Sequence, residues 1–231
     1  MTGAVRKQSN KESVARKAIE HLGEEMPAPD TSGPSDDWMN QFEKYAEDAS
    51  SDRLQELWGR TLAGEIRKPG TFSLVTLQYI STIDSSIADL IDSVLPYVLN
   101  NRFIVINDDH SIFPDISTLI ELEQIGFGNL SSGMLTTKAK SNVNNALWFY
   151  NCDNAMIIQF DTFQEIDIKS FILSIPGREI SKLVSKKGDM DELAKLFWQF
   201  NPVKISTGAI IRHETQISMP TPKESTRPAG K

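Results

Sequence analysis

The stretch that decides the fold is LQELWGRTLAGEIRKPGTFSLVTL, residues Leu54 to Leu77. Its first part carries apolar residues at the spacing of one helix face, and the pair Pro69-Gly70 ends that pattern. Ser73 follows at a position suited to capping the next helix. The stretch therefore predicts two helices joined by a short turn.

Glu65 is the most informative single position, because it lies in the apolar stripe within about 20° of both Leu54 and Trp58. An unpaired carboxylate in that place would be costly. We expect Glu65 to accept backbone N–H groups from the start of the Ser73 helix, where the helix dipole favours an anion. The alternative is a buried acid or ligand, although no His or Cys stands nearby in the sequence to share a site.

Other short helices are predicted on both sides of this stretch. Trp38, Phe42, Tyr45 and Ala49 share one helix face that begins after a cap at residue 36 or 37. A further helix starts at residues 84–85 and is kinked or ended by Pro96. Residues 36–101 are thus expected to form a four-helix unit.

Residues 1–35 are expected to hold an N-terminal helix and a Pro-rich linker. The helix, from Val5 to Leu22, has only a thin stripe made by Val14, Ala18 and Leu22, so it would be marginal alone. We expect it to be ordered by docking, either on its own helical unit or on a second subunit.

Residues 102–211 are expected to form a mixed α/β unit that loosely resembles a winged helix. The predicted elements are a strand at 103–106, a helix at 116–125 capped by Asp115, a hairpin around 151–154, the strand FILSI at 171–175, helices at 176–187 and from 189, and a strand at 203–211. Residues 212–231 have three prolines and few apolar residues, which predicts a disordered tail. The expected fold class is α+β.

The net charge of −7 is unevenly distributed. Residues 1–22 carry +3 and residues 212–231 carry +2, which leaves about −12 on the chain between them. Because a field of that sign repels phosphate backbones, nucleic acid could be bound only through the basic arms. The predicted helix 116–125 contains Glu121 and Glu123 without Lys or Arg, so it would read a DNA groove poorly.

The composition is that of an ordinary globular protein, with 39% hydrophobic and 24% charged residues. No stretch approaches the roughly 18 apolar residues that a membrane span needs, and the N-terminus lacks the apolar run of a secretory signal. A single cysteine, Cys152, excludes an intrachain disulfide. We expect a cytoplasmic protein without membrane contact.

Three further motifs favour ordinary structural roles. Asp108, Asp109 and His110 are adjacent and so do not converge on a metal, which favours a solvated turn. Cys152 lacks the cationic neighbours of a reactive thiolate. The loop at 126–133 lacks the Lys of a phosphate-binding loop. We therefore expect neither a cofactor nor a metal site.

The pattern W-x3-LAGE-x3-PG-x-FS-x2-TL from Trp58 to Leu77 resembles the uncharacterised bacterial family domain of unknown function 2806. Further segments are similar to that family in the same order, although Ser174 and Ile180 depart from its usual Thr and Leu. They are RKQSN at 6–10, DDW at 36–38, LIELEQIGF at 119–127 and SIPGREISKL at 174–183. The resemblance implies no activity, and it marks a structural signature at Trp58, Glu65, Pro69, Gly70, Phe72 and Ser73.

These observations favour a non-enzymatic bacterial protein-interaction module that binds a protein partner or a second copy of itself. A nucleic-acid-binding regulator that uses the basic arms and the winged-helix-like unit is the alternative, with nucleic acid the less expected partner. An enzyme of unrecognised type is the third choice. The sequence does not indicate a small-molecule ligand.

Overall fold

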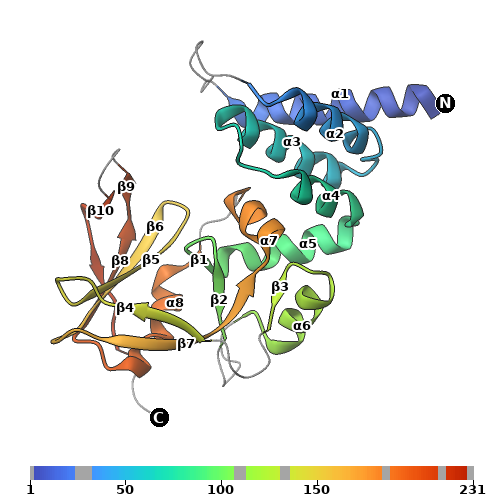
Figure 1. The fold of residues 1–231 in the computed structure, drawn as a ribbon. Coiled ribbons are helices and arrows are strands. Elements are labelled where there is room, and N and C mark those ends of the chain that lie inside the picture. Colours follow the sequence, from blue (N-terminus) through green and yellow to red (C-terminus); the bar gives the residue numbers. More distant parts are fainter. Residues whose placement is uncertain are drawn as a thin grey trace. The chain divides into compact units, whose positions relative to one another are not determined.

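The computed structural model describes residues 3–23, 33–106, 113–130, 136–183, 188–212 and 217–227. The chain forms two compact parts (Figure 1). The helical unit comprises Met1–Ser93 together with Ile175–Leu183, and the sheet unit comprises Val94–Ser174 and Val184–Lys231. Helices and antiparallel sheets occur in separate parts of the chain, so the fold class is α+β as predicted.

Short helices make up the helical unit. They are α1 (Gly3–Leu22), α2 (Asp36–Ala46), α3 (Asp52–Arg67), α4 (Leu74–Thr82), α5 (Ser85–Val94) and α7 (Ile175–Ile180), which continues into the 3-10 turn η2 (Ser181–Leu183). Serine side chains cap three of them, Ser35 on α2, Ser51 on α3 and Ser73 on α4. The predicted cap of α2 at residue 36 or 37 is wrong, because Ser35 holds the extended backbone of a cap and both aspartates lie in the first turn.

The helix α1 docks on α3 of its own chain, and the two lie along each other in Figure 1. Val14, Ala18 and Leu22 are buried, as the stripe predicts. Gly59 of α3 permits the close approach, because a Cβ atom there would lie 2.6 Å from the Cβ of Lys17. The Lys17 ammonium lies 2.9 Å from Asp52, and this hydrogen bond raises the pKa of Lys17 above its ordinary value.

The segment 175–183 belongs to the helical unit, whereas the sequence predicts it in the mixed unit. Long-range bonds explain the difference, since the buried Arg60 donates to the carbonyl of Leu183 at 3.0 Å. The predicted helix at 176–187 is also shorter in the structure, with α7 ending at Ile180 and residues 184–187 lying outside the described part.

The sheet unit contains two larger antiparallel sheets. The first has the order β1 (Val98–Leu99), β2 (Phe103–Val105), β7 (Glu165–Leu173), β3 (Gly128–Asn129), and β4 (Thr136–Lys140) also pairs with β7. The second has the order β11 (Lys223–Glu224), β8 (Lys204–Ala209), β6 (Asn154–Gln159), β5 (Ala146–Asn151). A pair formed by β9 (Ile211–Arg212) and β10 (Ile217–Ser218) is separate. The other elements are η1 (Leu95–Tyr97), α6 (Ile116–Gln124), α8 (Met190–Lys195) and η3 (Trp198–Phe200).

Aromatic rings from both sheets and from the turn after α8 meet in the core of this unit. The ring of Phe149 lies 5.9 Å from that of Phe103 and 4.8 Å from that of Phe197, measured between centroids. Alternate residues of β7 are buried, which matches a strand with one face on this core.

The sheets differ from the predicted winged-helix likeness. The strand at 103–106 pairs with β7 in the first sheet, whereas the predicted hairpin, β5 and β6, belongs to the second sheet. The long strand β7 causes this difference, because it pairs with β2, β3 and β4. The sequence predicts a strand only at FILSI, which overlaps the last three residues of β7.

The tail from residue 212 also differs from its predicted disorder. Lys223 and Glu224 form β11 and pair with Thr207 and Ser206 of β8. Backbone pairing at a sheet edge requires no apolar side chain, so the composition of the tail does not reveal it. A hydrogen bond from Lys223 lowers the pKa of Asp191 in α8, which adds a charged contact to the strand.

Candidate functional site

The signature turn, residues 68–73 between α3 and α4, is held by hydrogen bonds from three helices. Pro69 ends the helix, and Gly70 adopts φ 82°, a left-handed conformation that glycine accepts without strain. Phe72 is buried and Ser73 caps α4. Four of the six residues predicted as a signature, Pro69, Gly70, Phe72 and Ser73, therefore belong to one turn, whereas Trp58 packs against α2.

Glu65 holds this turn from the side of α3. Its carboxylate is 2% exposed and accepts the N–H of Gly70 at 2.6 Å and that of Phe72 at 2.9 Å. Each carboxylate oxygen has one backbone donor, which compensates the removal of the charge from water. The donors belong to the turn before α4 rather than to the first turn of the helix itself.

Phe72 is held through both its carbonyl and its ring. The carbonyl accepts the indole N–H of Trp38 at 2.8 Å, which ties the turn to α2. The ring lies over Gly64 of the LAGE motif, where an added Cβ would meet the ring at 2.8 Å. The ring centroid of Trp58 lies 5.4 Å from that of Phe42 in an edge-to-face contact, and Trp58 is part of the buried core of the helical unit.

Glu179 of α7 completes the arrangement, and it has no counterpart among the residues predicted from the sequence. Its carboxylate accepts the backbone N–H of Ser73 at 2.7 Å and the hydroxyl of Ser73 at 3.0 Å. Glu179 lies in the segment SIPGREISKL, which the sequence marks only by its family resemblance. Its contact with Ser73 could not be predicted from the sequence, because the two residues are 106 positions apart. Lys182 adds a hydrogen bond to the carbonyl of Thr71 at 3.3 Å.

This geometry makes the signature a structural joint that holds four helices, α2, α3, α4 and α7. Both carboxylate oxygens of Glu65 and one of Glu179 accept hydrogen bonds from the protein itself, and Trp38 donates its N–H to a backbone carbonyl. Groups satisfied in this way are poorly placed for proton transfer or for ligand binding.

Replacing Glu65 with glutamine is expected to lower the free energy of unfolding by about 1–3 kcal/mol, because one charge-assisted acceptor becomes an amide facing an N–H group. Urea denaturation of the full chain measures the change. Glu12→Gln is the matched control at an exposed position of α1 and should stay within about 0.5 kcal/mol of the natural chain. Equal effects at the two positions would contradict a structural role for Glu65.

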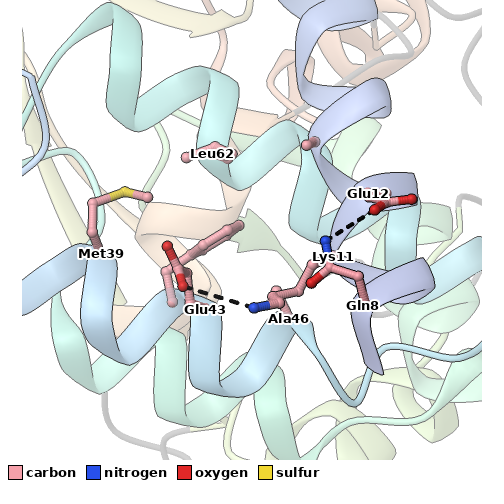
Figure 2. Close-up of a pocket in the computed structure, with 9 residues that line it drawn as sticks. Gln8, Lys11, Glu12, Met39, Glu43, Ala46 and Leu62 are labelled. Atoms are coloured by element: carbon pink, nitrogen blue, oxygen red, sulfur yellow. Dashed lines mark hydrogen bonds and ion pairs between the residues drawn. The ribbon is translucent and has the colours of Figure 1, made fainter. Parts of the chain in front are cut away.

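A pocket of about 290 Å³ opens on another part of the helical unit, between α1, α2 and α3. Figure 2 shows the residues that line it. Gln8, Lys11 and Glu12 belong to α1, Met39, Glu43 and Ala46 belong to α2, and Leu62 belongs to α3. The polar residues form a rim, in which Gln8 donates to Glu12 at 2.9 Å and Lys11 lies 4.0 Å from Glu43. The apolar lining consists of Ala15, Met39, Phe42, Ala46 and Leu62.

Only some of the remaining sequence candidates lie within the described residues. Cys152 lies at the tip of the β5–β6 hairpin with φ 51°. Asp108, Asp109 and His110 lie outside the described residues, as does most of the second half of the loop at 126–133. Within the described ranges, no group of three or more His, Cys, Asp or Glu side chains is placed to hold a metal ion. A helix both long and apolar enough to span a membrane is likewise absent from those ranges.

Residues 2–104 match the model of a family described as "Protein of unknown function (DUF2806)". The chain thus resembles this family over slightly less than half of its length, and the match includes the signature and the pocket. The similar segments at 119–127 and 174–183 lie beyond the matched residues. No curated protein and no solved structure matches the chain.

Proposed function

We propose that this chain is a non-enzymatic protein-interaction module of the bacterial cytoplasm, and that it binds a protein partner through the pocket of the helical unit. The apolar pocket between α1, α2 and α3 is the observation that carries the proposal. Apolar hollows with a polar rim are typical of the places where one anchoring side chain of a partner enters an interface.

The size of the pocket suits such an anchor. Pockets for small-molecule ligands commonly have about 300–1,000 Å³, so this pocket is slightly smaller than that range. The rim carries both signs of charge, Lys11 against Glu12 and Glu43, which favours a polar surround over attraction of one ionic ligand. An apolar side chain of a protein partner fits both properties.

The test compares two variants of the same helix. Ala15→Glu introduces a charge into the apolar lining at an exposed position, and Ser9→Glu introduces the same charge at an exposed position about 120° around α1 from Ala15 and outside the lining. Affinity capture from the native host, read by mass spectrometry, is expected to recover a partner with the natural chain and with Ser9→Glu but to lose it with Ala15→Glu. Circular dichroism checks that both variants fold. A partner retained by Ala15→Glu would refute the pocket as the binding site.

The alternative of nucleic-acid binding through the N-terminal arm loses support from the ion pairs of α1. Lys7 pairs with Glu47, Lys11 lies near Glu43, and Lys17 pairs with Asp52. Because these carboxylates compensate three of the five basic side chains in residues 1–22, little free positive charge remains on the arm for phosphates.

A further inference from the structure

A groove of about 780 Å³ in the sheet unit lies between the strands β4 and β5. It is lined by the whole of β4, from Thr136 to Lys140, and by residues Ala146 to Phe149 of β5. Both strands are at the margin of their sheets, since β4 pairs only with β7 and β5 only with β6 among the strands that the structure describes. The groove therefore follows two sheet edges.

Among the residues that the structure describes, no strand pairs with the outer edge of β4. Ser141 donates its N–H to Gln164, which continues the register of β4 on β7 and shows that Thr137 and Ala139 turn their backbone groups toward β7. The residues between them, Thr136, Lys138 and Lys140, must then direct N–H and C=O groups away from the sheet. A strand placed beside β4 would find a complete ladder of donors and acceptors.

The edge of β5 is largely closed in comparison. Asn142 exchanges hydrogen bonds with the backbone of Ala146 at 2.9 and 3.1 Å, and Asn100 does so with that of Tyr150 at 2.8 and 2.9 Å. Of the three residues between these two closed positions, Trp148 alone directs its backbone groups to the edge, and it is 37% exposed. The longer pairing edge in the groove is thus that of β4.

The charge and the floor of the groove specify what can pair there. Arg102, Lys138 and Lys140 line it without any carboxylate among the described lining residues. Glu165 lies 3.7 Å from Lys138 and 3.0 Å from Lys140, and Asp167 stands opposite Lys138 in the register and accepts a hydrogen bond from Thr136. These two carboxylates offset the charge of the two lysines, so the excess positive charge of the lining comes from Arg102. The floor is apolar, with Phe103 and Ile172 among its residues.

A second copy of this chain is a poor occupant of this edge. Pairing of two β4 strands would bring the lysines of one edge opposite those of the other, and like charges across a ladder destabilise it. Lysines on a free edge commonly prevent such self-association. An acidic strand would be attracted instead.

We propose that the β4 edge binds an extended segment of a partner protein in which acidic and apolar residues alternate, added to the first sheet as a further strand. The backbone of the segment pairs with Thr136, Lys138 and Lys140, while its side chains point alternately to the apolar floor and to the lysines. This site lies in a different unit from the pocket that carries the proposed function, so the two proposals stand independently.

The test uses a fluorescent ten-residue peptide of alternating Asp and Val, titrated into the full chain and followed by anisotropy. Lys138→Pro removes the N–H that points into the groove without removing a bond to β7, and Lys138→Gln removes the same charge but keeps the N–H. We expect Lys138→Pro to weaken binding by about tenfold or more, and Lys138→Gln to weaken it clearly less.

A second peptide, N-methylated at every other residue, tests the pairing without altering the protein, and it should bind the natural chain about tenfold or more weakly than the unmethylated peptide. The variant Ala15→Glu in the helical unit should bind the unmethylated peptide with unchanged affinity, which separates this site from the pocket. Absence of peptide binding, equal binding by Lys138→Pro and Lys138→Gln, or full affinity of the methylated peptide would overturn the proposal. Tight binding of oligothymidylate that displaces the peptide would also overturn it, by assigning the groove to a single-stranded nucleic acid.

Discussion

Replacing Trp58 with alanine is expected to lower the free energy of unfolding of the helical unit by about 3–5 kcal/mol, the usual cost of truncating a buried aromatic side chain. The indole is 2% exposed and packs against Phe42 and Tyr45, with centroid separations of 5.4 and 6.2 Å. Removing it leaves a hole between α2 and α3 that surrounding rings cannot fill without leaving their own contacts. Urea denaturation followed by circular dichroism measures the loss.

Trp148→Ala is the matched control for this substitution. Trp148 lies on the edge strand β5 and keeps 37% of its surface exposed, so its removal should cost only about 1 kcal/mol. Similar losses for the two tryptophans would show that Trp58 is not the core anchor that its position on the apolar stripe predicts.

Removing α1 is expected to have an effect of similar size. A chain that begins at Ser35 loses the burial of Val14 and Leu22, each on the order of 1.5–3 kcal/mol, together with the hydrogen bond from Asn10 to the carbonyl of Glu47. It also uncovers the apolar lining of the pocket on α2 and α3. The shortened chain should therefore melt at a lower temperature and associate more readily, as light scattering would show.

Two point variants in the full chain serve as controls for the removal of α1. Val14→Ala should be destabilising and Ile19→Ala nearly neutral, because Val14 is 1% exposed whereas Ile19 is 68% exposed on the same helix. If the shortened chain proves a monomer of unchanged stability, α1 contributes nothing to folding or to assembly and acts only as a tether.

The local parts of the helical unit were predictable from the sequence. Helix periodicity places the stripes of α2 and α3, Pro69-Gly70 marks the turn, and Ser73 caps α4. The need of Glu65 for nearby backbone donors follows from the same kind of information, because a buried carboxylate requires donors and the first N–H groups of a helix have no partner within it. The sequence predicts donors at the start of α4, whereas the structure supplies them from the preceding turn, five and seven residues after Glu65.

The sheet unit was predictable in its elements rather than in its pairing. The β5–β6 hairpin and the cap of α6 by Asp115 are local, and both have the predicted form. The partners of β7 and the addition of β11 to β8 are not local, because any extended segment with free backbone groups can satisfy a sheet edge. The alternation of apolar and polar side chains predicts which face of a strand is buried, but it does not predict which strands pair with it.

The sequence thus determined the helices, the caps of α3 and α4 and the need of Glu65 for nearby donors, since each depends on residues within two turns of one another. Only the tertiary structure decided that Glu179 holds Ser73 and that α1 docks on its own α3. The same holds for the free edge that β4 leaves beside a basic groove. These features arise where segments distant in the chain compete for the same surfaces and hydrogen-bonding groups, and that competition is settled by the packing of the whole unit.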